Sequence, residues 1–140
     1  MTGDSWLRTG RGFPSGGLEL QAEYREGNHS SKNHLPAIGS VIRQSFGCSE
    51  IFEGSLNLHA AEPFVFPDAA RVTCNGAAWC FAPVIIDECV VGVAARRPPP
   101  DNTEFLEVFA CEKLAPILGI SYGQQVTVRI LPGSHLGLAA

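Results

Sequence analysis

The chain has 140 residues, of which 45 % are hydrophobic, and its formal net charge is −4. This length predicts a single domain that buries about two-thirds of its unfolded surface and needs neither a disulfide nor a metal to fold, and the hydrophobic share excludes an intrinsically disordered chain. The basic residues are scattered and no stretch reaches the roughly 18 apolar residues of a membrane span, so we expect neither a nucleic-acid nor a membrane partner.

The first part of the chain carries strand signals separated by polar segments. Residues 6–12 predict a first strand that ends in a glycine turn. Residues 18–22 alternate between apolar and polar side chains, which indicates a half-buried strand. Residues 25–33 are polar and predict a loop.

A helix is predicted over residues 35–46. Asn33 or Ser31 is a candidate N-cap, and Pro36 suits the first turn. Gly47 is placed to end the helix in a left-handed conformation. The apolar side chains recur at spacings of three and four, which puts them on one face: Leu35, Ile38, Ile42 and Phe46.

The remainder of the chain is mainly strand. Asn75-Gly76 predicts a tight hairpin turn between residues 71–74 and 77–86, and Asp87-Glu88 predicts a second turn into residues 89–94. A loop is predicted over residues 96–102 and a strand over residues 103–110. A short helix over residues 112–118, which Gly119 ends, and a last strand over residues 124–131 follow. Strands joined by hairpins and accompanied by two helices predict a small antiparallel barrel or sandwich. We expect one domain over residues 1–140, with the barrel over residues 4–131 and a loose tail over residues 132–140.

The five cysteines are odd in number and form no Cys-x-x-Cys pair. Residues 1–11 lack the apolar core of a signal peptide. We therefore expect reduced, buried thiols in a cytoplasmic protein. A zinc site that uses Cys74, Cys80 and His59 is an alternative, although this spacing matches no common ligand pattern.

Ser55 and Asn57 stand two residues apart in the run Gly54-Ser55-Leu56-Asn57-Leu58. Alternate side chains of an extended segment share a face, so the hydroxyl and the carboxamide point to the same side. Mg²⁺ takes hard oxygen ligands and often only one or two of them from the protein. The pair predicts a Mg²⁺ site, but it also fits a polar strand edge that binds no ion.

Three blocks of the sequence carry a family resemblance. Phe46-Gly47 is followed, after a spacer, by F-E-G-S-L-N-L at residues 52–58. Residues 104–110 read E-F-L-E-V-F-A, and residues 114–130 contain a short helix and a closing strand. Together they resemble the archaeal-type, CTP-dependent riboflavin kinase family, whose first two blocks read L-G-F-x-P-Y-x-G-T-L-N-L and E-I-I-E-I-I-A.

The resemblance implies a mainly β fold with two helices and a small six-stranded β-barrel of the cradle-loop type. It also implies transfer of the γ-phosphoryl group of CTP to the primary hydroxyl of riboflavin, giving FMN and CDP, a reaction that depends on positioning and charge neutralisation. By resemblance, Ser55 and Asn57 hold Mg²⁺ and Glu107 contacts the flavin. No catalytic residue is assigned, and the implied nucleotide contacts are Gly10, Gly12, Glu112, Lys113, Leu114 and Ala115.

The chain departs from the family pattern at three places. Phe13-Pro14 stands where the glycine-rich loop has Glu-Gly, and proline removes one N–H donor from a phosphate cradle. Pro99 replaces a flavin-side threonine of the family, and Ala115 replaces an arginine. Glu107 and Lys113 match the family pattern, but they also fit charged side chains that simply face solvent. Three hypotheses stay open: a riboflavin-kinase-like enzyme, a flavin- or nucleotide-binding barrel without catalysis, and a structural or oligomerisation barrel. The sequence does not determine the oligomeric state.

Overall fold

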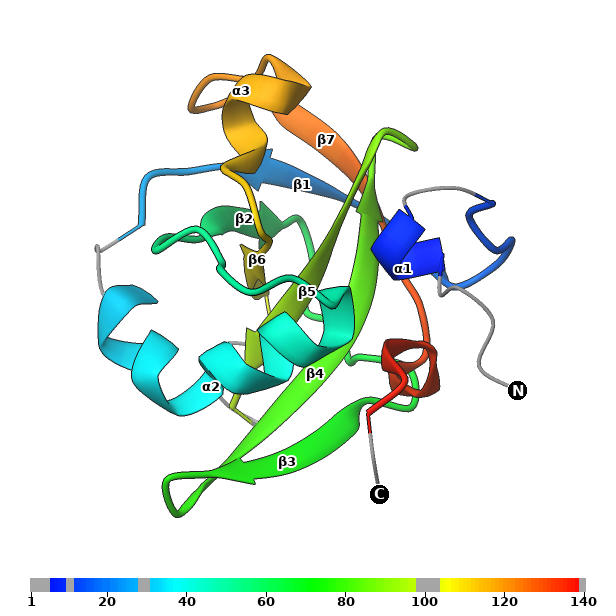
Figure 1. Cartoon of the computed structure of the whole chain (residues 1–140). Helices are drawn as coiled ribbons and strands as arrows, with labels where there is room; N and C mark the ends of the chain where they lie inside the picture. The colour runs from blue at the N-terminus through cyan, green and yellow to red at the C-terminus, as the bar shows by residue number, and fades with distance from the viewer. Residues whose placement is uncertain (1–5, 10–11, 28–30, 98–103, 139–140) are drawn as a thin grey trace.

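The computed structural model describes residues 6–9, 12–27, 31–97 and 104–138, with the side chains of residues 31–33 left aside. Figure 1 shows a barrel of strands with α2 lying across its front and α3 above it. In chain order, the elements are α1 (Trp6–Thr9), β1 (Leu18–Tyr24), α2 (Ser31–Phe46), β2 (Leu56–Ala60), β3 (Ala70–Cys74), β4 (Ala77–Ile86), β5 (Val90–Arg96), β6 (Phe105–Phe109), α3 (Leu114–Leu118), β7 (Gln125–Ile130) and the 3₁₀ helix η1 (Gly133–Leu136).

Six strands form a closed antiparallel barrel in the order β4-β5-β6-β2-β1-β7, and β7 pairs back to β4. This confirms the predicted mainly β fold and its six-stranded barrel. β3 is an additional strand, which pairs with the first half of β4 through residues 77–81, whereas β7 pairs with residues 84–86. The described residues form three α-helices where two were predicted.

Pro83 lies in β4 at the point where the neighbouring strand changes from β3 to β7. Its carbonyl accepts a hydrogen bond of 2.9 Å from Leu131 N, which places its ring nitrogen on the same edge. A proline in a strand interior normally removes a ladder hydrogen bond. Here the position without an N–H faces the gap between the partner strands β3 and β7, so no ladder hydrogen bond to either strand is lost.

Side chains that alternate along the strands fill the barrel interior, and every second residue points out of it. Small residues such as Ala22, Ala82 and Ala94 share this space with larger aliphatic ones. A six-stranded barrel is narrow, so side chains fill it and leave no channel. The larger interior residues include Leu58, Val84, Ile86, Leu106, Val108, Val128 and Ile130.

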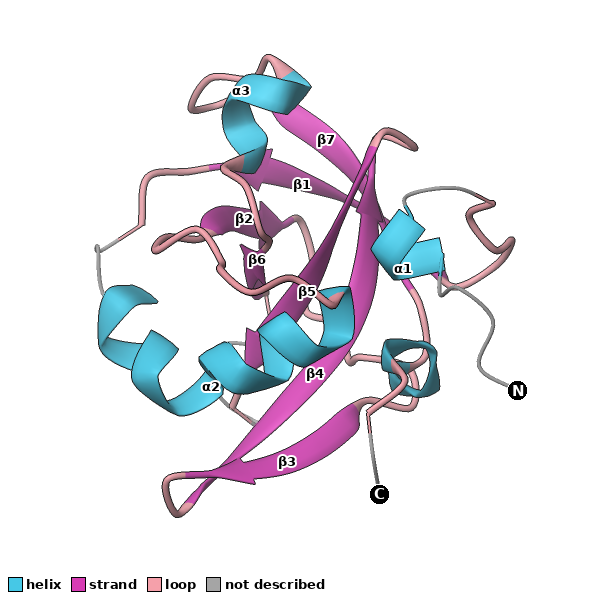
Figure 2. Ribbon diagram, viewed as in Figure 1, coloured by secondary structure: helices cyan, strands magenta, loops and turns pink. Residues whose placement is uncertain are grey.

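A second core lies outside the barrel, between α2 and the strands that this helix crosses in Figure 2. Ile38, Val41 and Ile42 of this helix pack against outward-facing Phe81 and Phe109. The period-3.6 apolar face predicted for the helix is therefore its buried face. None of the helices in the described part of the chain is long and apolar enough to cross a membrane.

Both predicted turns are confirmed. Asn75 and Gly76 have φ angles of 50° and 78°, which suit the two-residue hairpin between β3 and β4. Asp87 and Glu88 have φ angles of 52° and 48° and begin the connection between β4 and β5. Gly47 has a φ of 71° and its N–H bonds to Arg43 O, so it ends α2 as predicted.

Several local predictions are wrong. Residues 6–9 form the helix α1 and no strand, because a four-residue element is too short to carry a periodic signal. The helix α2 begins at Ser31, so Asn33 lies inside it and does not cap it, and Pro36 lies beyond the first turn. The prediction started at Leu35 because the apolar pattern starts there. Of the loop predicted over residues 96–102, Arg96 ends β5 and residues 98–102 lie outside the described residues.

The C-terminal segment is packed, and the prediction of a loose tail is wrong for residues 133–136. These residues form η1, in which Leu136 is buried within the outer core. Trp6 Nε1 of α1 donates a hydrogen bond of 3.1 Å to His135 Nδ1. The buried Leu136 side chain and the Trp6–His135 hydrogen bond thus hold the two ends of the described chain together.

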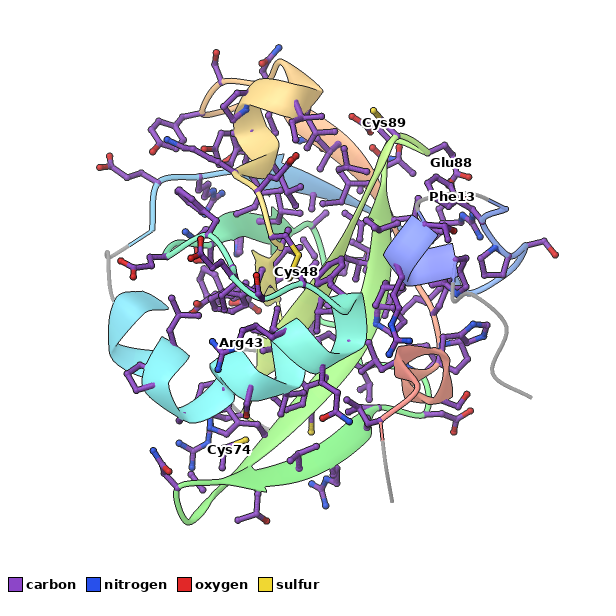
Figure 3. The ribbon with its side chains drawn as sticks, in the orientation of Figure 1. Phe13, Arg43, Cys48, Cys74, Glu88 and Cys89 are labelled. Atoms are coloured by element: carbon purple, nitrogen blue, oxygen red, sulfur yellow. A yellow bond between two sulfur atoms is a disulfide. The ribbon has the colours of Figure 1, made fainter. Side chains whose placement is uncertain are left out.

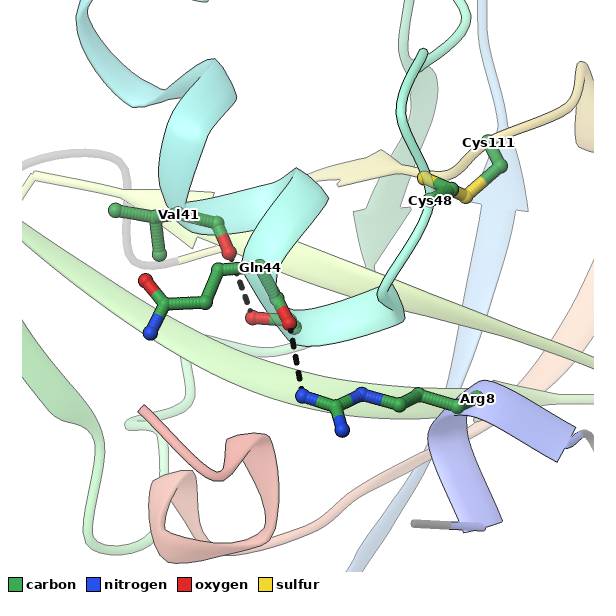
Figure 4. The surroundings of a disulfide bond; sticks show 6 residues. Arg8, Val41, Gln44, Cys48 and Cys111 are labelled. Atoms are coloured by element: carbon green, nitrogen blue, oxygen red, sulfur yellow. Dashed lines mark hydrogen bonds between the residues drawn. A yellow bond between two sulfur atoms is a disulfide. The ribbon is translucent and has the colours of Figure 1, made fainter. Parts of the chain in front are cut away.

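The prediction of five reduced thiols is also wrong. Cys48 and Cys111 form a disulfide across 63 positions of sequence (Figure 4). Cys74 and Cys80 are free and buried, as predicted, and Cys89 is free but exposed. Pairing depends on proximity in the fold, which cysteine spacing in a single sequence does not reveal.

Arg129 of β7 joins three segments on the outside of the barrel. Its guanidinium donates to both carboxylate oxygens of Glu88, at 2.6 and 2.9 Å. It also donates to the carbonyl oxygens of Pro14 and Gly16, at 2.7 and 2.8 Å. The hydrogen bonds from Arg129 to Glu88 lower the pKa of the Glu88 carboxyl below its usual value. The arginine therefore fixes the segment before β1 against the β4–β5 turn.

We expect Arg129→Met to lower the free energy of unfolding by about 1–3 kcal/mol, because two backbone carbonyls lose a charged donor. Glu88→Gln is the matched control and should cost less than about 1 kcal/mol, since Glu88 is exposed and exposed ion pairs contribute little. Urea unfolding of both variants measures the difference. Equal losses would show that the ion pair, and not the carbonyl contacts, stabilises this junction.

Candidate functional site

Ser55 and Asn57 lie where the chain enters β2, and their side chains meet as the sequence predicts. Ser55 Oγ donates a hydrogen bond of 3.2 Å to Asn57 Oδ1, and Asn57 Nδ2 is 3.5 Å from Ser55 O. Leu56 and Leu58, the alternate residues, are buried in the barrel. The interior leucines therefore fix the register that turns both polar side chains outward.

Glu107 lies directly opposite Asn57 in the β2–β6 ladder. Ser55 and His34 of α2 are both close enough to the Glu107 carboxyl group to lower its pKa. Burial raises the pKa of the Glu107 carboxyl, and this outweighs the lowering by His34 and Ser55. The structure thus brings together the predicted metal pair and the predicted flavin contact.

A groove of about 430 Å³ runs along the outer face of β2 and β6. The segment that follows β1 forms its other wall. We call it the β2–β6 groove, and its lining residues are Arg25, Glu26, Gly27, Asn57, Leu58, His59, Phe105, Leu106 and Glu107. Its volume lies in the range of about 300–1,000 Å³ that is typical of small-molecule sites.

The groove has an aromatic end and a polar end. His59 and Phe105 are opposite each other in the ladder, and their ring centroids are 4.7 Å apart. The Phe105 side chain is 46 % exposed, an unusual position for a large apolar ring. Asn57 and Glu107 occupy the next outward positions. A planar ligand can stack on the rings while its polar atoms face the amide and the carboxylate.

A second, smaller hollow lies beside the start of α3, and we call it the α3 hollow. Its volume is about 30 Å³, which is room for little more than a water molecule. Ser55 lies on its wall, next to the β2–β6 groove. The hollow brings together four of the six predicted nucleotide contacts, and its lining residues are Tyr24, Phe52, Gly54, Ser55, Leu56, Val108, Ala110, Glu112, Lys113, Leu114 and Ala115.

The remaining predicted nucleotide contacts are Gly10 and Gly12. Gly10 lies outside the described residues. Gly12 precedes Phe13, which Figure 3 places beside Glu88 and well away from Cys48. The Phe13 ring contacts Trp6 of α1 with centroids 6.1 Å apart. The structure therefore does not bring Gly12 to the Ser55–Asn57 pair, because the segment precedes β1 and is held on the side of Arg129.

The oxygen donors at the β2 entrance fit Mg²⁺. Ser55 Oγ and Asn57 Oδ1 are 3.2 Å apart. Neighbouring ligands in an octahedral Mg²⁺ shell, each about 2.1 Å from the ion, lie about 3 Å from each other. The Glu107 carboxyl group adds a third oxygen donor near the pair. All three are the hard ligands that this cation prefers.

The alternative zinc site of Cys74, Cys80 and His59 finds no support. These residues belong to three different strands, β3, β4 and β2. Across the described ranges, no three histidine, cysteine or acidic side chains gather closely enough to hold a metal ion.

Sequence reasoning missed four residues of the β2–β6 groove and its surroundings, and one of them is Phe105, which shares an outward face with Glu107. His59 carries a signal, since it is two residues from Asn57 on the same outward face. Gly27 and His34 carry none, because they reach the site from the segment before α2 and from α2 itself. A Cβ on Gly27 would overlap the Asn57 carboxamide, so only glycine lets the chain pass this close.

No protein-family model matches the chain, and no curated protein sequence matches it.

Gly27→Ala should displace the Asn57 carboxamide and lower the free energy of unfolding by about 1–3 kcal/mol through overpacking. In an Asn57→Ala background the same substitution should cost much less, since the clashing group is gone. A double-mutant cycle by urea unfolding measures this coupling. Additive losses would contradict the contact.

Glu107→Gln should change the pH dependence of stability. The folded protein holds the Glu107 proton to a higher pH than the unfolded chain, in which the pKa is about 4.3. The contribution of the Glu107 proton to the free energy of unfolding is therefore fully present below the unfolded-state pKa and is lost as pH rises through the folded-state pKa. Glutamine has no proton to lose, so the variant should gain stability relative to wild type between about pH 4 and pH 7. Urea unfolding across this range tests it, and a difference that is constant or falls would contradict it.

Proposed function

We propose that the chain is a Mg²⁺-dependent phosphotransferase that transfers the γ-phosphoryl group of CTP to riboflavin, giving FMN and CDP. The convergence of Ser55, Asn57 and Glu107 supports this most directly. The sequence resemblance singled out these residues from two separate blocks, and they meet at one end of a groove of ligand size.

The lining of the β2–β6 groove supports a flat, partly polar acceptor. The His59–Phe105 pair offers a stacking surface, and Glu107 and Asn57 offer hydrogen-bonding partners at the same wall. An isoalloxazine ring combines a flat aromatic surface with polar edge atoms, which suits both features. The acceptor hydroxyl then faces the oxygen donors at the entrance of β2.

Ser55, Asn57 and Glu107 are the residues that would hold the metal. Mg²⁺ neutralises charge on phosphate oxygens, which is the main requirement of phosphoryl transfer. Asn57 is held in place by Ser55 and by the close approach of Gly27. Lys113 lines the α3 hollow, with its Nζ 5.8 Å from the Phe52 ring centroid, and is the cation that would contact the phosphates.

A second candidate is a barrel that binds flavin or nucleotide without catalysis. The small volume of the α3 hollow favours it, because phosphates cannot enter about 30 Å³ without movement of Phe52 or its loop. The position of Gly12, away from Ser55, also favours it. This candidate predicts saturable quenching of riboflavin fluorescence that weakens in Phe105→Ala, with no FMN formed when CTP is added.

We expect purified protein with CTP, Mg²⁺ and riboflavin to form FMN, detected by chromatography. Asn57→Ala should lower the rate about a hundredfold or more, because a preorganised charge-stabilising group is lost. Arg71→Ala changes an exposed side chain on β3, outside the barrel, and should leave the rate unchanged. No FMN with CTP or with any other nucleoside triphosphate in the presence of Mg²⁺ would refute the proposed reaction.

A further inference from the structure

Loop 49–55 connects α2 with β2 and closes the α3 hollow from outside. Phe52 donates its backbone N–H to Ala110 O at 3.0 Å, and among the described residues the loop makes no other backbone–backbone hydrogen bond. The Phe52 ring lines the α3 hollow with Lys113 beside it. Ser55 ends the same loop, so movement of the loop moves one proposed metal ligand.

The disulfide joins the two segments that the Phe52 contact joins. Cys48 immediately precedes the loop, and Cys111 immediately follows Ala110. Figure 4 shows the Cys48 end on the chain that leaves the last turn of α2 and the Cys111 end on the chain that leaves β6. Both cysteines are half-buried, so a small reductant can reach them.

The loop has space on its opposite side. A hollow of about 540 Å³ separates it from α2, and its lining residues are Leu35, Pro36, Arg43, Ser49, Glu50, Ile51 and Glu53. Within the loop, Ser49, Glu50, Phe52 and Glu53 are exposed. Few buried contacts and a single backbone hydrogen bond are the marks of a segment that opens at low cost. The covalent bond is therefore the strongest restraint on it.

We propose that the Cys48–Cys111 disulfide is a redox-sensitive tether that keeps loop 49–55 closed, and that its reduction lets the loop swing toward α2 and opens the α3 hollow. The second part of the proposal is that the opened hollow admits the phosphates of a nucleotide, and this part rests on the proposed function. The closed, oxidised protein is then the less active form, so the FMN assay proposed above is run on reduced protein.

The chemistry is thiol–disulfide exchange with a dithiol reductant. One reductant thiolate attacks a sulfur of the Cys48–Cys111 bond and forms a mixed disulfide, which releases the other cysteine as a thiolate. The second reductant thiol then displaces the first cysteine. Two electrons and two protons pass to the protein, giving two cysteine thiols, and the reductant leaves as its own disulfide.

Hydrogen–deuterium exchange on the full chain tests the tether. Protein is compared before and after reduction with dithiothreitol, at labelling times at which β4 and β5 stay unexchanged in the oxidised state. The Phe52 amide should exchange about tenfold faster or more after reduction. A Cys48→Ser/Cys111→Ser variant should exchange fast without reductant, and Cys89→Ser, which removes an exposed free thiol, should keep the redox response.

Equal exchange of the Phe52 amide in the two redox states would overturn the tether. Loss of protection throughout β4 and β5 at the same labelling times would also overturn it, because the disulfide would then stabilise the whole fold and not the loop. In-situ reduction of the wild-type chain keeps this test valid even if the double variant does not fold.

Calorimetric titration with CTP and Mg²⁺ tests the second part separately. Affinity should rise about tenfold or more on reduction in wild type and in Cys89→Ser, whereas Phe52→Ala should bind equally in both redox states because its hollow is already open. If the Phe52 amide responds to reduction but CTP binds in neither state, the tether stands and the proposed nucleotide site fails. Equal CTP binding by both states of wild type would overturn the gating role.

Discussion

The fold depends on the pairing of β7 with the second half of β4, since this pairing closes the sheet into a barrel. Val84, Ile85 and Ile86 pair with residues 128–130, while the first half of β4 pairs with β3 along the same edge. Closure removes the free edges of the six barrel strands and gives each of them an inside and an outside. Pro83 stands where the partner changes, which makes a residue that usually disrupts sheets compatible with the centre of this one.

The inside–outside alternation that follows from closure also creates the candidate site. Leucine and valine positions of β2 and β6 are fixed inside the barrel, so the intervening residues must face outward. Asn57 and His59 then lie opposite Glu107 and Phe105 because the strands are antiparallel and in register. A one-residue slip would bury the polar set and expose the leucines, so barrel packing holds the polar set in place.

Much of this could be predicted from local patterns, and the rest could not for identifiable reasons. Alternation marks most of the barrel strands, and Asn75-Gly76 marks a hairpin, because these signals depend on neighbouring residues. The Cys48–Cys111 pair, the approach of Gly27 to Asn57 and the burial of Leu136 depend on contacts between distant segments. The candidate site was predicted only in part for the same reason. Asn57 and Glu107 lie on strands whose alternating pattern can be recognised in the sequence, whereas Gly27 and His34 approach them from segments that carry no such pattern.

The contrast between the two hollows bears on mechanism. The β2–β6 groove is open and has ligand volume, whereas the α3 hollow is almost filled and lies under a loop held by a single backbone hydrogen bond and a disulfide. The proposed acceptor can therefore enter the closed form, whereas the proposed nucleotide needs the loop to move. Because Ser55 belongs to this loop and bonds to Asn57, opening the hollow must also adjust the proposed metal ligands. Under the proposed function, entry of phosphates and completion of the Mg²⁺ site are thus one conformational event, which separates a resting barrel from a competent one.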